Sequence, residues 1–427
     1  MHLGVVGLAE TRTDSNWGRF VARLAQMRIN DVDLADGATF LSGPPHDYFD
    51  FLRREHPVAW VDHVELDGPG FWALTKWEDV MAVERDPETF SSYTGGAFIG
   101  PVDEGTRLMM INQDPPRHTR LRKLVSRMFT PRHIRSIEGH VQTAAKEIVD
   151  RAAPQGEIDF VTEVAADLPL IVIAELIGVP QEDRHKVFEW SNRMVGAEDP
   201  EYGADSDVQE VAAELYAYAQ RLAEERLADP GEDIVTLLLT GEVDGEKLTV
   251  LEFNVFFLLL AVAGNETTRN LITGGTLALL EHDDQREQFL SQPDVLAPSV
   301  EEMLRYVSPV NYFRRTATRD TEIRDVPIKA GDKITLWYPA ANRDPDQFPD
   351  PHTFDIDREP NEHVAFGGRG PHFCLGANLA RYEINCMFEE LRRILPDMEL
   401  TGPVERLHMN LINGIKHMPV RFTPVEN

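Results

Sequence analysis

The sequence predicts a mainly α-helical protein with small β-sheets, and three observations support this fold class. Apolar residues recur at helical spacing at nearly every position from residue 115 to about 290. Residues 58–77 and 321–344 instead alternate apolar and polar residues, which is the period of a strand. No internal repeat and no Gly/Ser-rich linker divides the chain. We therefore expect one domain over residues 37–427, with residues 1–36 as a weakly patterned leader of the same domain.

The expected elements follow in chain order. A helix begins after the proline pair at residues 44–45 and breaks at Pro57, and the Gly-Pro-Gly turn at residues 68–70 then predicts a hairpin. A second small β element is expected around Gly331, and a last hairpin within residues 411–422. Between these β segments, four prolines are expected to separate helices: Pro131, Pro154, Pro180 and Pro230.

Charge and hydropathy restrict the functional class. The chain has 72 acidic and 42 basic residues, for a net charge of −30. This charge favours solubility and opposes binding to nucleic acid or to anionic membrane surfaces. The longest strongly apolar run, residues 253–264, is too short to span a bilayer, and the apolar start of the chain lacks the basic flank of a signal peptide. We expect a cytoplasmic protein with no nucleic-acid partner and no integral membrane segment.

The chain has only two cysteines, which makes a disulfide scaffold implausible at this size. Cys386 follows a helical pattern and is interpreted as core packing. Cys374 lies in the Gly-rich stretch AFGGRGPHFCLGANLAR, two positions after His372. That spacing directs the two side chains to different sides, which is poor geometry for a nucleophile and its base. No further Cys or His follows at the spacing of a zinc site.

A lone thiolate suits a metal whose other positions are filled by a macrocycle, as in thiolate-ligated haem. Gly367, Gly368 and Gly370 would let the backbone approach the macrocycle and turn its N–H groups toward the sulfur. A helix beginning just after Gly376 would stabilise the negative sulfur at its N-terminus. The pattern Phe-x-x-x-Gly-x-His-x-Cys-x-Gly resembles the cysteine-ligand loop of the cytochrome P450 monooxygenases.

The resemblance implies haem b bound through Cys374, with Phe366, Gly368 and Gly376 beside the cofactor. It is strongest to bacterial members that act on sterol side chains, methyl-branched lipids and terpenoids. One feature departs from the family pattern. Phe366 lies eight residues before Cys374, one more than is usual in the family, because the Gly-rich stretch contains an extra residue. The departure leaves open how Phe366 sits against the thiolate.

A strongly apolar helix abruptly carries Gly-Asn-Glu-Thr-Thr from Gly264, mostly poor helix formers where burial is expected. Either the helix ends at Gly264 and restarts with a threonine cap, or a kinked central helix crosses a cofactor. The stretch resembles the oxygen-binding helix of the same family, where Gly264 would clear space above the iron. The resemblance implies that Thr267 hydrogen-bonds the oxygen and that Glu266 belongs to the proton route. This pair favours dioxygen over peroxide as the oxidant.

Glu302 and Arg305 are three residues apart, a spacing that commonly gives only an ion pair on a helix face. They also resemble the Glu-x-x-Arg motif of the family, a buried structural motif that Arg358 would complete here. The resemblance therefore assigns this trio a structural role and no chemistry.

Residues 115–137 contain seven Arg or Lys residues and no acidic residue. Such a concentration indicates either a surface for an anionic group or acidic partner, or a helix paired with acidic neighbours. The resemblance implies contacts to the haem propionates from His118 and Arg122, and further contacts from Arg315 and His372. The other basic residues would dock an acidic ferredoxin on the thiolate side of the haem: Arg117, Lys123, Arg127 and Arg132.

The reaction implied by the resemblance is insertion of one oxygen atom from dioxygen into a C–H bond, with electrons from NAD(P)H through a reductase and a ferredoxin. The expected substrate is small and lipophilic: a terpenoid, a sterol side chain or a branched lipid. By family position, ten residues would contact it: Phe98, Ile99, Val262, Ala263, Val310, Asn311, Tyr312, Phe313, Leu411 and Ile412.

Two other classes remain open from the sequence. A haem sensor or carrier without turnover would need the cysteine loop but not Glu266 and Thr267. A thiol hydrolase using Cys374 and His372 would contain no haem.

Overall fold

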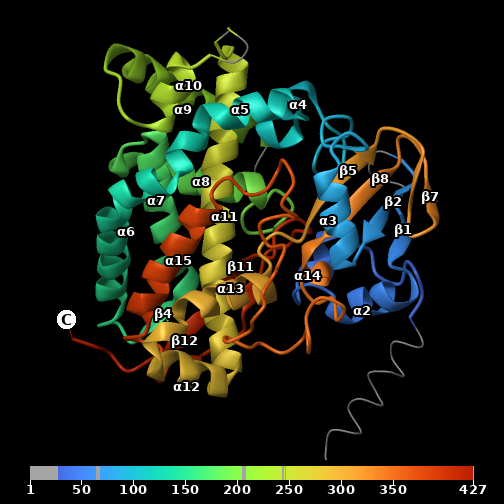
Figure 1. The fold of residues 1–427 in the computed structure, drawn as a ribbon. Coiled ribbons are helices and arrows are strands. Elements are labelled where there is room, and N and C mark those ends of the chain that lie inside the picture. The colour runs from blue at the N-terminus through green and yellow to red at the C-terminus, as the bar shows by residue number, and fades with distance from the viewer. Residues whose placement is uncertain (1–26, 64–67, 204–207, 243–244, 246, 427) are drawn as a thin grey trace, which may run out of the picture.

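The computed structural model describes residues 27–63, 68–203, 208–242, 245 and 247–426. Figure 1 shows a large body of helices on one side and a smaller part built around a β-sheet on the other. This arrangement confirms the predicted mainly helical fold with small sheets.

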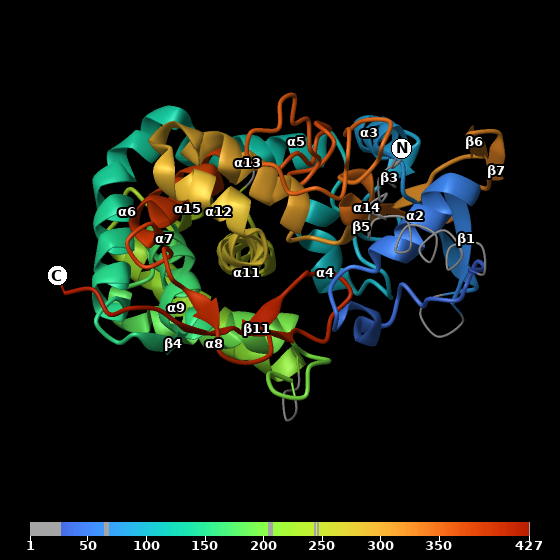
Figure 2. The same cartoon turned by 90° about the horizontal axis from the view of Figure 1, so that it is seen from below.

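One long helix, α11 (Val250–Glu281), runs through the helical body, and Figure 2 shows it end-on with other helices around it. It begins with a capping box, in which Thr249 and Glu252 each bond the other's backbone N–H. The helix continues without a break through Gly264, so the alternative in which a helix ends at that residue is wrong. By length and composition α11 could cross a membrane, but 56% of its most apolar window is buried inside the protein.

The other helices surround α11 or flank the sheet. Pro131 is the first residue of its helix, and Pro154, Pro180 and Pro230 lie between helices, so the predicted breaks are confirmed. The body contains α5 (Arg117–Val125), α6 (Pro131–Ala152), α7 (Asp167–Ile177), α8 (Arg184–Val195), α9 (Val208–Ala228), α10 (Ile234–Thr240), α12 (Asp283–Ser291), α13 (Leu296–Val307) and α15 (Ala377–Leu391). Shorter helices are α2 (His46–Glu55), α3 (Trp77–Arg85), α4 (Glu104–Leu108) and α14 (Tyr338–Ala341). Single turns are η1 (Gly37–Phe40), η2 (Met110–Asn112), η3 (Ser126–Phe129), η4 (Val161–Ala165), η5 (Gln181–Asp183) and η6 (Pro293–Val295).

The main sheet has five strands in the order β1 (Val58–Asp62), β2 (Gly70–Leu74), β8 (Lys333–Trp337), β5 (Tyr312–Ala317) and β3 (Phe90–Ser91). β1 and β2 pair antiparallel, which confirms the predicted first hairpin. β8 comes from the second alternating segment but pairs parallel with β2. The two predicted β segments therefore share one sheet, while β6 (Thr321–Ile323) and β7 (Val326–Ile328) of the second segment form a separate hairpin.

The hairpin predicted within residues 411–422 is wrong. β11 (Ile415–His417) pairs with β10 (Glu405–Arg406), whereas β12 (Pro419–Arg421) pairs with β4 (Glu157–Asp159) and β9 (Glu399–Leu400). Only Met418 separates β11 from β12, which is too short for a hairpin turn between paired strands. The chain instead passes directly from one small sheet into another.

Residues 1–26 of the predicted leader lie outside the described residues. Within residues 27–36, Leu34 is fully buried, and Met27 and Val32 pack against the apolar cluster that contains Trp337 of β8. The described part of the leader is thus continuous with the core beside the sheet. A single domain for residues 37–427 stays a prediction.

The predicted structural trio is assembled and buried. Arg305 donates to both carboxylate oxygens of Glu302 at 2.7 Å, and the Nε atom of Arg358 lies 3.2 Å from Glu302 Oε2. Neither Glu302 nor Arg305 is exposed to solvent. Arg305 also donates to the carbonyl oxygens of Asn342, Pro351 and Thr353, so α13 is tied to a long stretch of irregular chain.

We expect Arg305→Ala to lower the free energy of unfolding by about 3–5 kcal/mol, because it leaves the carboxylate of Glu302 buried without its main partner. Chemical denaturation followed by circular dichroism measures this loss. Arg421→Ala is the control, since its ion pair with Glu399 lies on the surface and should contribute little. Equal stability of the two variants would contradict the assignment.

Candidate active site

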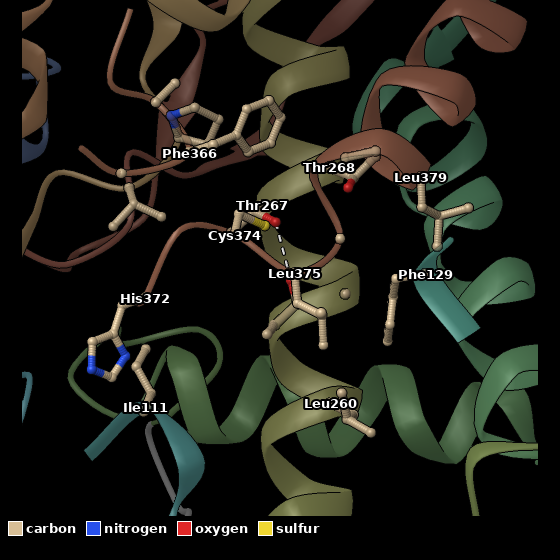
Figure 3. Close-up of a pocket in the computed structure, with 18 of the residues that line it drawn as sticks. Ile111, Phe129, Leu260, Thr267, Thr268, Phe366, His372, Cys374, Leu375 and Leu379 are labelled. Carbon is tan, nitrogen blue, oxygen red and sulfur yellow. Dashed lines mark hydrogen bonds between the residues drawn. The ribbon is translucent and has the colours of Figure 1, made fainter. Parts of the chain in front are cut away.

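A cavity of about 250 Å³ lies beside α11, and most of its lining is apolar. α11 contributes residues between Leu259 and Leu271, and the loop before α15 contributes Cys374. Figure 3 shows Cys374, Thr267 of α11 and Leu379 of α15 around this space. Because helix, loop and sheet residues meet here, the cavity brings together motifs that are far apart in the sequence.

Cys374 is held by the backbone of its own loop. Its N–H donates to the carbonyl oxygen of Phe366 at 2.9 Å, and α15 begins three residues later. Burial raises the pKa of the Cys374 thiol, while a hydrogen bond from the Gly376 backbone and the charges of Arg122 and Arg381 act in the opposite direction. The Gly376 N–H and the two arginines therefore favour the negatively charged thiolate. A metal cation bound at the sulfur would offset the cost of burying that charge.

The position of Phe366, which the sequence left open, is set by Arg381. The Arg381 guanidinium lies over the Phe366 ring, 4.6 Å from its centroid, and the Phe373 ring meets the same ring edge-on at 6.4 Å. Glu301 of α13 holds Arg381 through two hydrogen bonds of 2.6 and 2.7 Å. Burial favours a higher pKa for Glu301, but the bonds with Arg381 and His363 lower it to about 2, so this carboxylate stays ionised.

Four basic side chains line the same cavity: His118 and Arg122 of α5, Arg315 of β5 and His372 of the cysteine loop. The rings of His118 and His372 are only 4.1 Å apart. Burial lowers the pKa of His118 to about 4, with the charges of Arg122 and Arg315 acting the same way, and lowers that of His372 well below its ordinary value. Within the described part of the chain, His118 Nδ1 has no hydrogen-bond partner. The cluster therefore has the properties of a site for an anionic group.

Thr267 and Glu266 face different surroundings although they are adjacent on α11. Thr267 lines the cavity, and its hydroxyl donates to the Ala263 carbonyl oxygen at 3.0 Å (Figure 3). Glu266 is buried outside the lining, where it pairs with Arg269 and accepts a 3.1 Å hydrogen bond from Ser191 of α8. The structure thus places one predicted catalytic residue at the cavity and the other directly behind it.

Gly264 lines the cavity, but its missing side chain serves helix packing. A Cβ atom at this position would lie 2.7 Å from the Cδ1 atom of Ile173 on α7. Ile173 also lines the cavity, and glycine at position 264 lets α7 approach α11 closely at this point. The role of Gly264 in clearing space above the iron stays a prediction.

Among the predicted substrate residues, Ala263, Val310 and Phe313 line the cavity. The predictions for Asn311 and Tyr312 are wrong. Successive residues of a strand point to opposite faces, so Tyr312 of β5 faces away from the cavity that Phe313 lines. The Tyr312 ring packs against that of Trp337 with centroids 4.9 Å apart. The Asn311 amide donates to the backbone of Asn410.

The remaining five predicted substrate residues lie outside the cavity lining: Phe98, Ile99, Val262, Leu411 and Ile412. The Phe98 ring contacts that of Phe313, with centroids 6.0 Å apart, and so supports the wall from behind. Ile99 and Leu411 pack against the core cluster around Trp337. A direct contact of these five residues with substrate stays a prediction.

Two cavity carboxyl groups were not predicted from the sequence, Glu84 of α3 and Glu383 of α15. Burial raises the pKa of Glu383 well above its ordinary value, and its Oε2 atom has no hydrogen-bond partner among the described residues. The sequence contains a signal for Glu383. It lies at helical spacing from Leu379 and Ala380, which places a glutamate on the apolar side of a helix.

Residues 286–391 match the family model described as cytochrome P450. The chain is 45% identical over 406 residues to a steroid C26-monooxygenase of Mycolicibacterium smegmatis, an alignment that covers 92% of this chain and 94% of the relative. The chain belongs to the cytochrome P450 family. A methyl-branched lipid omega-hydroxylase of Mycobacterium bovis is also 45% identical to this cytochrome P450, over 404 residues and 92% of each chain.

Solved structures agree with this membership. A Mycobacterium marinum cytochrome P450 in complex with pseudoionone superposes with a TM-score of 0.86 at 39% identity, covering 93% of this chain and 99% of that one. A Bacillus megaterium enzyme in complex with testosterone gives a TM-score of 0.80 at 32% identity, covering 88% and 97%. The predicted cytochrome P450 fold is therefore confirmed.

Membership identifies this cytochrome P450 as a monooxygenase that binds haem. The cavity fits this cofactor, because it combines a thiol with a basic cluster in which His118 lacks a partner for one ring nitrogen. His372 contacts Ser92 and the His118 ring, and no described hydrogen bond joins it to Cys374. Neither the thiol hydrolase nor a haem carrier without turnover therefore describes this chain.

If Arg122 contacts a haem propionate as predicted, Arg122→Ala should speed the loss of haem about tenfold, because one charge-assisted contact to the cofactor would be lost. The transfer of haem to an excess of apomyoglobin measures this rate. Arg120→Ala is the matched control, since Arg120 is an exposed residue of the same helix and lies outside the cavity lining. Identical rates for both variants and the wild type would show that Arg122 does not hold the cofactor.

Proposed function

We propose that this cytochrome P450 hydroxylates the terminal methyl group of a branched apolar chain, carried by a steroid or by a methyl-branched lipid. The observation that carries the proposal is the pair of relatives at 45% identity over 92% of the chain. One is a steroid C26-monooxygenase and the other a methyl-branched lipid omega-hydroxylase. Both names describe oxidation at the end of a branched alkyl chain.

The cavity wall supports a lipophilic substrate of this kind. Apart from the basic cluster, the lining is dominated by aliphatic and aromatic side chains such as Ile111, Leu260 and Phe313. An alkyl chain gains about 0.8 kcal/mol for each CH₂ group that it buries against such a surface. A terpenoid is the second candidate, because the similar Mycobacterium marinum structure contains pseudoionone.

We assign the haem contacts as follows. Cys374 would bind the iron through its sulfur, and the basic cluster of His118, Arg122, Arg315 and His372 would hold the propionates. The cavity lining contains more basic groups than carboxyl groups, which supports the placement of the propionates against this cluster. When bound, haem activates dioxygen for insertion into a C–H bond.

Thr267 holds a proton at its hydroxyl on the cavity side of α11. Its bond to the Ala263 carbonyl fixes the oxygen atom and leaves a lone pair that accepts a proton. Glu266 is proposed to belong to the route that delivers that proton, because it is the adjacent carboxyl group and is connected to Ser191 and Arg269 on the other side of the helix.

Electrons come from a ferredoxin in this proposal, and the ferredoxin is reduced by NAD(P)H through a reductase. Lys123 and Arg127 are exposed at the end of α5 and in the following turn, and Arg132 is exposed at the start of α6. Lys123 adjoins Arg122, a lining residue of the cavity, so an acidic protein docked here would lie close to the cofactor. Arg117 contributes less than expected, because it pairs with Glu252 of α11. We place the enzyme in the cytoplasm, where such partners occur.

The substrate proposal is tested with the purified protein, a bacterial ferredoxin and its reductase. The enzyme is supplied separately with a steroid that has a branched side chain, a methyl-branched fatty acid and pseudoionone, and products are identified by mass spectrometry and NMR. We expect a hydroxyl group on a terminal methyl carbon of the steroid or the branched lipid. Oxidation of pseudoionone alone, or of a steroid ring carbon, would overturn the proposal in favour of another substrate class.

We expect Thr267→Ala to lower the yield of hydroxylated product by about 100-fold through loss of proton transfer, while haem binding stays unchanged. Product formed per NADPH consumed is the measurement. Thr273→Ala is the matched control, because its hydroxyl makes the same bond to a carbonyl four residues earlier on α11 but lies outside the cavity lining. If both variants keep the wild-type yield, Thr267 has no role in proton delivery.

The docking surface is tested by charge reversal. We expect Lys123→Glu with Arg127→Glu to slow reduction by ferredoxin about tenfold or more at low salt, with the difference shrinking as salt screens the charges. Reduction by dithionite should be unaffected. Lys329→Glu with Arg421→Glu changes the net charge equally at other exposed positions and serves as the control. Equal rates for both double variants would exclude this surface.

A further inference from the structure

The Gly-rich stretch of the cysteine loop is held by α3. Gly368, in the Gly-rich stretch between Phe366 and Cys374, donates its N–H to Glu84 Oε2 at 2.9 Å. The carbonyl oxygen of the same residue accepts a 3.2 Å hydrogen bond from Arg85 Nε. Both backbone groups of Gly368 are therefore bonded to the last two residues of α3.

The loop also touches this end of α3 directly. A Cβ atom on Gly370 would lie 1.9 Å from the carbonyl oxygen of Glu84, and one on Gly368 would lie 3.1 Å from Glu84 Cβ. A side chain at Gly370 would thus force the loop and the helix apart. The two glycines permit a contact that brings the loop backbone against α3.

Glu84 has two further partners, and both line the cavity that contains Cys374. The Tyr338 hydroxyl donates to Glu84 Oε1, and the Nη2 atom of Arg315 lies 3.8 Å from the same oxygen. Burial and the charge of Glu84 raise the pKa of Tyr338 well above its ordinary value, so the tyrosine remains a donor. Glu84 is 4% exposed, so its charge acts in a buried setting.

We propose that Glu84 is a positioning residue for the haem thiolate. Its carboxylate fixes the Gly-rich stretch through Gly368, and its negative charge partly balances Arg315 in the basic cluster. The first effect sets where the sulfur of Cys374 lies, and the second sets the electrostatic potential at the cofactor. The proposal rests on the assignment of Cys374 as the haem ligand and is independent of the substrate.

Substitution separates the two effects. Glu84→Ala removes both the acceptor for Gly368 and the negative charge, whereas Glu84→Gln keeps an acceptor oxygen and removes only the charge. Tyr338→Phe keeps the charge and removes one donor. Glu78→Gln is the matched control, because Glu78 is on the same helix, its side chain is 83% exposed and it pairs only with surface groups.

The holoprotein is reduced with dithionite and exposed to carbon monoxide, and the absorption spectrum gives the ratio of thiolate-ligated to other haem. We expect Glu84→Ala to lower this ratio about tenfold, which corresponds to loss of one hydrogen bond to a charged group. Glu84→Gln should keep most of the wild-type ratio but raise the reduction potential, because a negative charge near the haem is gone. Tyr338→Phe should alter both readings less, and Glu78→Gln should match the wild type.

A wild-type ratio and a wild-type potential in Glu84→Ala would overturn the inference. Should that variant fail to fold, Gly370→Ala replaces it, since it displaces the loop from α3 while Glu84 remains, and an unchanged ratio there would also overturn it. Cys374→Ala is run in parallel. Loss of the red-shifted band in Cys374→Ala confirms the ligand on which the inference depends. A wild type that lacks this band contradicts the ligand assignment itself.

Discussion

The geometry of the active site depends on the buried ion pairs of α13. Glu302 binds Arg305, and Arg305 then donates to three carbonyl oxygens of the irregular chain between α14 and the cysteine loop. The neighbouring Glu301 holds Arg381, which lies over the ring of Phe366. Two adjacent residues of α13 thus fix this part of the chain. Glu302, through Arg305, holds the irregular segment before the cysteine loop, and Glu301, through Arg381, holds the loop itself. Because both carboxylates are buried or half-buried and paired, the loop keeps one position without regular secondary structure.

A second constraint is electrostatic. The chain carries a net charge of −30, yet the cavity beside α11 contains four basic side chains and a thiol. Burial, and after it the charges of the neighbouring basic groups, lower the pKa values of His118 and His372. An anionic cofactor relieves the repulsion between these basic groups, so haem binding and the folding of the cavity favour each other. Glu84 provides part of the compensation from within the protein.

The sequence was sufficient to predict those parts of the fold and of the site that belong to a recognisable motif. Only the lone thiol of Cys374 pointed to haem by its own chemistry. The buried trio and the roles of the basic cluster came from the family resemblance, because a Glu and an Arg three residues apart are common on helix surfaces and the basic stretch by itself left two explanations open. The wrong predictions concern which side of a strand faces the cavity and which strands pair with each other. Residues 310–313 were assigned to the substrate as one run by family position, but successive residues of a strand face opposite sides, and Tyr312 of β5 faces away from the cavity. The pairing of β11 and β12 with different sheets depends on strands far away in the chain, which local pattern does not record. Glu84 was missed because its partners lie more than 200 residues away.

The wrongly assigned residues still help to determine what the cavity accepts. The Tyr312 hydroxyl accepts the Ile99 N–H at 3.2 Å, and Arg314, also on the far face of β5, donates to the Gly100 carbonyl at 3.2 Å. These bonds hold the short segment that carries Phe98, whose ring packs behind Phe313 in the cavity wall. The wall therefore has two layers, with one face of β5 lining the cavity and the other fixing the loop that supports it. The shape of the cavity therefore depends on both layers, because a shift of the outer loop moves Phe98 and with it the packing of the Phe313 ring in the cavity wall.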